Sequence, residues 1–179
     1  MNNKILKITT ILISIIIIVS CRTTRSIESV LNDYKTTKLE IIEKSEGDIN
    51  LDGITDLVIV TKNKINSKKK ILVFLKDKKS NVIKEFLNEN IISTDEDEEY
   101  HFSGIKIKNG TLSITFYGGM CHREGHELIF KYNLDFNDLY FETLKISTHN
   151  VCNDSEPNEY EETNRELRKL KFVDYTKEH

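Results

Sequence analysis

The spacing of apolar residues changes along the chain, and each change predicts a different element. Ile27, Val30, Leu31 and Tyr34 recur at helical spacing, which places them on one side of a helix. Ser26 can cap the first turn of this helix, because its hydroxyl can accept a hydrogen bond from a free backbone N–H. We therefore expect a short N-terminal helix that packs one face against the core.

After the helix the period becomes two, which indicates β-strands. Apolar positions predict strands at residues 39–42, 57–61, 71–75, 105–107, 112–116, 128–134 and 139–146. Residues 82–87 fit either a strand or a short helical turn. The strands are separated by hairpin loops at residues 63–70 and 135–138 and by Asn109-Gly110, a strong hairpin turn signal.

Near the end of the chain, Ser155-Glu156-Pro157 is typical of a helix start. A narrow apolar stripe at helical spacing follows: Tyr160, Thr163, Leu167 and Leu170. No long stretch rich in Pro or Gly divides the chain. We therefore expect residues 26–179 to form a single α+β domain dominated by antiparallel β-sheet, with an N-terminal and a C-terminal helix.

The first 21 residues predict where in the cell the protein is located. Lys4 and Lys7 form a basic head, and residues 8–19 are an apolar run shorter than the about 20 residues of a spanning helix. The run ends at Ile18-Val19-Ser20-Cys21, which resembles the lipobox of bacterial lipoproteins. The resemblance implies a signal peptide at residues 1–20, a lipid on Cys21, a tether at residues 21–25 and attachment to a membrane of the cell envelope. The alternative is an N-terminal membrane anchor that is never cut.

The charge distribution argues against nucleic acid as a partner. The formal net charge is −3, and removing Lys4 and Lys7 with residues 1–20 gives −3 − 2 = −5. Basic residues alternate with acidic ones instead of forming a stripe, so the electrostatic footprint of a nucleic-acid-binding protein is missing. The acidic run at residues 95–99 is most simply a solvated loop.

Of the three cysteines, one is a candidate for lipid attachment and the other two can pair with each other. If Cys21 carries a lipid, Cys121 and Cys152 remain as a pair in an oxidising compartment, where a disulfide can persist. The bridge would close a loop of about 30 residues and add roughly 3 kcal/mol by the chain-entropy estimate. The alternative is two unpaired thiols.

Residues 48–56 carry oxygen ligands at the spacing of a calcium loop. Asp48, Asn50, Asp52 and Asp56 occupy positions 1, 3, 5 and 9, and Ile54 at position 7 can offer its carbonyl oxygen. Gly53 stands at position 6, where the loop has to turn sharply. Carboxylates that converge repel one another, and a cation would relieve that repulsion. The competing interpretation is a series of Asx turns, in which Asp and Asn side chains bond their own backbone.

An EF-hand does not fit this loop. Position 12 is Ile59, inside a predicted strand, where an EF-hand has a bidentate Glu. The loop instead resembles the D-x-N-x-D-G-x-x-D loops between strands of FG-GAP and VCBS repeats, and this resemblance implies weakly bound calcium. Those proteins form propellers from several copies, whereas this chain contains a single copy.

A longer resemblance covers about residues 39–145. The aspartate loop, then Lys108-Asn109-Gly110, Tyr117-Gly118-Gly119 and Phe130-Lys131-Tyr132, are similar to motifs of a family of uncharacterised exported bacterial proteins, which we take to be lipoproteins. Members often carry Trp on both sides of an arginine, and here His122 and Glu124 flank Arg123. The resemblance supports the expected fold, and the family has no established activity to transfer.

Candidate chemistry beyond the loop is sparse. His122, Glu124 and His126 occupy alternate positions, so on a strand they would face one side and could together bind a zinc ion. The glycines around them instead favour a solvent-exposed loop. The sequence shows no ordered Ser-His-Asp set, nucleotide-binding glycine loop or metalloprotease helix. We therefore expect a membrane-anchored, non-catalytic binding or structural module with a calcium-binding loop. The alternative is an inhibitor or immunity protein that meets an envelope enzyme, and a hydrolase is a third, weaker hypothesis.

Overall fold

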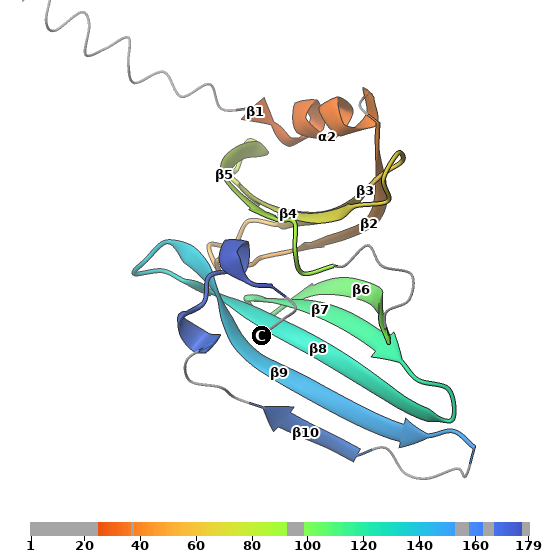
Figure 1. Ribbon diagram of the computed structural model, residues 1–179. Helices are drawn as coiled ribbons and strands as arrows, with labels where there is room; N and C mark the ends of the chain where they lie inside the picture. Colours follow the sequence, from red (N-terminus) through yellow and green to blue (C-terminus); the bar gives the residue numbers. More distant parts are fainter. Residues whose placement is uncertain (1–24, 37, 93–98, 153–157, 163–166, 177–179) are drawn as a thin grey trace, which may run out of the picture.

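The structure is a computed structural model that describes residues 25–36, 38–92, 99–152, 158–162 and 167–176. These residues form two five-stranded sheets in which all neighbouring strands are antiparallel. The first sheet contains, in spatial order, β1 (Arg25–Ser26), β5 (Asn81–Asn88), β4 (Lys69–Lys76), β3 (Asp56–Asn63) and β2 (Leu39–Gly47). The second contains β10 (Asn158–Glu162), β9 (Asp138–Asn150), β8 (His122–Asn133), β7 (Thr111–Gly118) and β6 (Tyr100–Lys108). Figure 1 shows the first sheet stacked on one part of the second.

Strands β3 and β4 of the first sheet are buried on both faces, which explains their unbroken apolar runs, whereas β2 and β5 each expose alternate residues on one face. Helix α2 (Ile27–Thr36) covers one face, where Val30 packs on Leu57, Ile59, Leu72 and Phe74. The other face points into the main core. A strand that is covered on both sides has no solvent-exposed face, so its sequence is continuously apolar and does not alternate.

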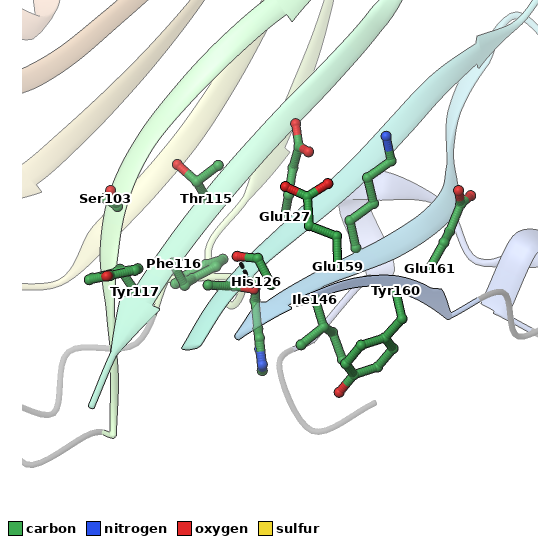
Figure 2. A pocket seen from close by; sticks show the side chains of 13 residues that line it. Ser103, Thr115, Phe116, Tyr117, His126, Glu127, Ile146, Glu159, Tyr160 and Glu161 are labelled. Carbon is green, nitrogen blue, oxygen red and sulfur yellow. Dashed lines mark hydrogen bonds between the residues drawn. The ribbon is translucent and has the colours of Figure 1, made fainter. Parts of the chain in front are cut away.

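The second sheet is covered on one face only, and its strands alternate accordingly. Leu112, Ile114 and Phe116 of β7 are buried, and their partners across β8 include Leu128 and Phe130. The opposite face of this sheet carries polar side chains that stand away from the core (Figure 2). Function that needs an accessible surface therefore has more room on the second sheet than on the first.

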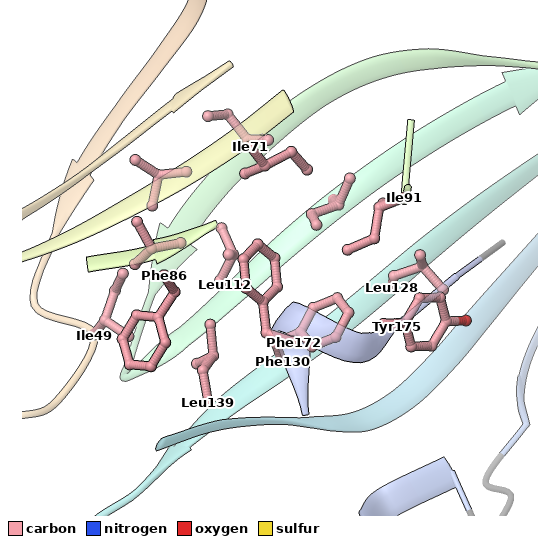
Figure 3. Packing of buried hydrophobic residues seen from close by; sticks show 14 of the residues in the cluster. Ile49, Ile71, Phe86, Ile91, Leu112, Leu128, Phe130, Leu139, Phe172 and Tyr175 are labelled. Atoms are coloured by element: carbon pink, nitrogen blue, oxygen red, sulfur yellow. The ribbon is translucent and has the colours of Figure 1, made fainter. Parts of the chain in front are cut away.

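The two sheets share one apolar core, which is closed by a contact between two strands on one side and by the C-terminal segment on the other. On one side β2 lies against β6, where the backbone N–H of Ile107 donates to the Ser45 hydroxyl at 3.2 Å. On the other side the C-terminal segment, with η1 (Leu167–Lys169) and η2 (Phe172–Asp174), enters between β5 and β9. Figure 3 shows Phe172 and Tyr175 of this segment beside Phe130, with ring centroids 5.3 and 5.4 Å from it.

The prediction of an α+β domain with helices at both ends is wrong. The described residues form a mainly antiparallel β structure with one α-helix, α2, and two short 3₁₀ turns. Asn158–Glu162 is the edge strand β10, and Tyr160 lies opposite Ile146 of β9. The expected helix start at residues 155–157 lies outside the described residues. A short helix is marginal alone, and hydrogen bonds along the edge of β9 satisfy this segment's backbone instead.

The other strands and turns agree with the structure, except that the loop favoured around His122, Glu124 and His126 is wrong, because these residues begin strand β8. The predicted strands and the loops between them are observed, each strand a few residues longer than expected. Residues 82–87, which fitted either a strand or a helical turn, belong to β5. The predicted signal peptide at residues 1–20 and Cys21, which is predicted to carry a lipid, lie outside the described residues.

Candidate functional site

The aspartate loop connects β2 to β3 and is held by side-chain to backbone hydrogen bonds. The Asp48 carboxylate accepts the N–H groups of Asp52 at 3.1 Å and Gly53 at 2.8 Å. Asn50 and Asp52 close further Asx turns, and Asp52 accepts the N–H of Ile54 at 2.8 Å. Gly53 has φ +81°, the left-handed conformation that the sharp turn requires.

Asp56 differs from the other loop acids because it is fully buried. Its two oxygens accept the N–H of Ile49 at 2.9 Å and of Lys76 at 3.0 Å, so it fastens the loop to the end of β4. Burial raises the pKa of its carboxyl above the ordinary value, the two hydrogen bonds oppose this, and the charges of Asp52 and Asp48 add to it. The three carboxylates are therefore close enough to repel one another.

The structure bears on calcium in two ways. The repulsion at Asp56 is the kind of charge that a cation would relieve, and a carboxylate oxygen that accepts one N–H keeps a second lone pair for a metal. On the other hand, no three His, Cys, Asp or Glu side chains of the described residues are grouped to hold a metal ion. The loop is already complete as a set of Asx turns, and calcium binding stays a prediction.

The predicted disulfide between Cys121 and Cys152 is confirmed, with the two Cα atoms 5.2 Å apart. Cys121 precedes β8 and Cys152 follows β9, so the bridge closes the open end of the β8–β9 hairpin. The backbone N–H of Val151 also donates to the carbonyl of Cys121 at 2.9 Å. This end of the second sheet is thereby fixed although it projects beyond the first sheet (Figure 1).

Of the three candidate zinc ligands, two contact each other and the third does not join that contact among the described residues. Glu124 Oε1 lies 2.5 Å from His126 Nε2, and the His126 ring stacks on Tyr100 with centroids 4.3 Å apart. The hydrogen bond to His126 lowers the pKa of Glu124, whereas burial and then Glu124 raise the pKa of Tyr100 to about 12. His122 is exposed and takes no part in this contact among the described residues. The group therefore ties β6 to β8 and does not assemble three metal ligands.

A groove of about 580 Å³ crosses the open face of the second sheet, and sequence reasoning did not predict it. Strand register places two rows of side chains across it. Thr115, Glu127, Lys145 and Glu161 form one row, and Tyr117, Gly125, Ser147 and Glu159 form the other. In Figure 2 the side chains of Thr115 and Glu127 point to the opposite side of the sheet from His126.

Small residues hollow out the middle of this groove. Gly125 lies on its floor, where an added Cβ would come 2.6 Å from the Ser147 hydroxyl and 3.5 Å from the Tyr117 ring. Tyr117 is 41% exposed and forms one wall, and the Arg123 guanidinium lies 5.8 Å from its ring centroid. The available signal in the sequence was Gly125 inside a strand, since such a glycine often marks a close approach or a ligand surface.

The groove carries more negative than positive charge. Its lining includes the carboxylates of Glu127, Glu159 and Glu161 against the single ammonium of Lys145. Hydroxyl groups of Ser103, Thr115 and Ser147 add hydrogen-bonding positions. The surface therefore suits a ligand that presents a positive charge, hydrogen-bonding groups and one apolar face to Tyr117.

Searches of the chain against protein-family models, characterised proteins and solved structures find no significant match. Within the described part of the chain, no helix has the length and apolar character needed to cross a bilayer.

Proposed function

We propose that the protein is a membrane-anchored, non-catalytic binding module of the cell envelope, whose binding surface is the groove on the second sheet. The observation that carries the proposal is the difference between the two sheets. The central strands β3 and β4 of the first sheet are covered on both faces, whereas the second sheet leaves one face open and hollow, with a concave lining of mixed polarity. Small-ligand and peptide sites are typically concave surfaces with a few placed polar groups.

The arrangement of the lining supports binding more than catalysis. Ser147 belongs to the groove face, whereas His126 lies in the register row of Phe116 and Ile146, whose side chains point to the other face. A serine and a histidine on opposite sides of one sheet cannot share a proton, which a nucleophile and its base have to do.

The anchor in this proposal comes from the N-terminal sequence. Acylation of Cys21 with more than one chain would hold the domain stably at a bilayer, where a single chain is marginal. Calcium at the loop of residues 48–56 is part of the same hypothesis, with Asp48, Asn50, Asp52, Asp56 and the carbonyl of Ile54 as the ligand set. The ion would supply charge neutralisation to a loop that borders the core.

The alternative of an inhibitor or immunity protein relied on the acidic run at residues 95–99, of which all but Glu99 lie outside the described residues. It stays a prediction, and the test of the groove also tests it. An envelope enzyme recovered on the groove residues would favour this alternative over a general binding module.

The test is photo-crosslinking of the full acylated protein in its own membranes. A p-benzoylphenylalanine at Tyr117 places the reactive ketone at the groove wall, and the same residue at Ile42 of β2 is a control of similar exposure, 41% against 38%. We expect a specific adduct from position 117 and none from position 42. Equal adducts from the two positions, or none from either, would contradict the assignment of the groove.

A further inference from the structure

The turn between β8 and β9 presents two large apolar side chains to solvent. Leu134 is 74% and Phe136 is 70% exposed. The turn is ordered by its own hydrogen bonds, because the Asn133 side-chain oxygen accepts the N–H groups of Asp135 at 2.9 Å and Phe136 at 3.2 Å. The Phe136 ring also contacts Tyr140, with centroids 6.0 Å apart. The two apolar side chains are therefore held outward by a defined turn.

This turn lies on the side of the molecule where the described chain begins. The Lys84 ammonium of β5 contacts the carbonyl of Asn137 in the turn, and Val82, two residues earlier in β5, pairs with Arg25 of β1. Two residues of a strand span about 7 Å. Figure 1 likewise shows the β8–β9 turn projecting on the side of the first sheet where β1 and β5 lie.

The tether limits how far this side can move from a bilayer. If Cys21 carries the lipid, the four steps from Cys21 to Arg25 span at most about 14 Å even when fully extended. The β1 and β5 side of the domain must then stay near the lipid headgroups. An exposed apolar turn on that side lies within reach of the same surface.

We infer that the β8–β9 turn inserts Leu134 and Phe136 into the headgroup region of the bilayer that holds the lipid anchor, an inference that depends on the anchoring proposed above. The contact fixes the orientation of the domain, so that the groove on the second sheet has a set direction relative to the membrane. Asp135, between the two apolar residues, keeps the insertion shallow, because a carboxylate is costly in hydrocarbon. Lys131 and Lys169 line the hollow beside Phe136 and Tyr140, where long basic side chains can reach phosphate groups. Arg168 also lines it and is bound to Glu142.

The absence of tryptophan from the chain makes a direct test possible. Phe136→Trp places a single fluorophore in the turn, and Ile65→Trp places one in the β3–β4 hairpin loop, where the replaced residue is 69% exposed. Both acylated variants are reconstituted into vesicles of phosphatidylcholine and phosphatidylglycerol, with ordinary or brominated acyl chains. Flotation of the vesicles reports anchoring separately from the fluorescence.

We expect the Phe136→Trp emission to shift to the blue on reconstitution and to be quenched by brominated chains, while the Ile65→Trp emission stays as in buffer. A chain that floats with the vesicles but shows the same unshifted emission in both variants overturns the inference and leaves the anchor intact. A chain that does not float overturns both. A blue shift of Phe136→Trp that depends on protein concentration without vesicles would assign the turn to self-association and also overturn the inference.

Discussion

Asp56 accepts a hydrogen bond from the backbone N–H of Lys76 at 3.0 Å, although 20 residues separate the two positions. The same carboxylate accepts the N–H of Ile49 inside its own loop. One buried side chain therefore joins the aspartate loop, the start of β3 and the end of β4.

Replacing Asp56 by Asn should lower the free energy of unfolding by roughly 1–3 kcal/mol. The amide has one acceptor oxygen instead of two, so one buried N–H loses its partner. Urea unfolding of the wild type and the variant measures the difference. Asp135→Asn, in an exposed turn, is the matched control and should change stability little; a loss of equal size in the control would contradict the argument.

Asp56 should also give stability a characteristic pH dependence. Its pKa is raised in the folded protein, so between the unfolded value near 3.9 and the folded value the native state binds more protons than the unfolded state. This contribution to stability is therefore largest at low pH and is lost as the pH rises through that window. Unfolding measured from about pH 3.9 upward should show this fall in the wild type and not in Asp56→Asn. Identical pH profiles would mean that Asp56 titrates normally.

The second sheet was easier to predict from the sequence than the C-terminal segment, and the reason is physical. Ile105, Ile107, Leu112 and Ile114 alternate around Asn109-Gly110, so period and turn chemistry agree on one hairpin. Tyr160 and Leu167 matched a helical stripe by spacing alone. The segment forms a strand because it can pair with the edge of β9. That pairing partner is distant in the sequence, so the residues of the segment alone do not reveal it.

The candidate site was predictable only in part for a related reason. Asp48 and its neighbours form one local loop, so their contacts follow from spacing. The groove is made by Tyr117, Gly125, Ser147 and Glu159, which come from four strands. Their meeting depends on strand register, which one-dimensional spacing does not reveal.

Removing the disulfide should destabilise the protein by roughly 3–4 kcal/mol, the chain-entropy estimate for a loop of this length. Cys121→Ser combined with Cys152→Ser removes both thiols and avoids new pairings. Thermal unfolding of the double variant, compared with the wild type under non-reducing conditions, measures the loss. Hydrogen exchange should increase most at the adjoining ends of β8 and β9, and uniform exchange across both sheets would contradict a local clamp.

Asn88 should be among the most sensitive buried positions. Its amide nitrogen donates to the carbonyls of Phe172 and Tyr175, and its oxygen accepts the N–H groups of Asn90 and Ile91, each at 2.8 Å. Asn88→Ala leaves these backbone groups without a partner, and we expect a loss of about 3 kcal/mol. Asn81→Ala in the same strand, where the side chain is half-buried, is the control and should cost less.

Calcium should distinguish the two interpretations of the aspartate loop. If the loop binds the ion, millimolar Ca²⁺ raises the melting temperature relative to excess chelator, because a ligand that binds only the folded state stabilises it. Asp52→Asn should weaken that response, since it removes one charge from the ligand set but keeps an oxygen that can accept the N–H of Ile54. Mg²⁺ at the same concentration controls for ionic strength. A melting temperature equal in Ca²⁺ and chelator would assign Asp48, Asn50 and Asp52 to the Asx turns alone, with their side-chain oxygens acting only as hydrogen-bond acceptors within the loop.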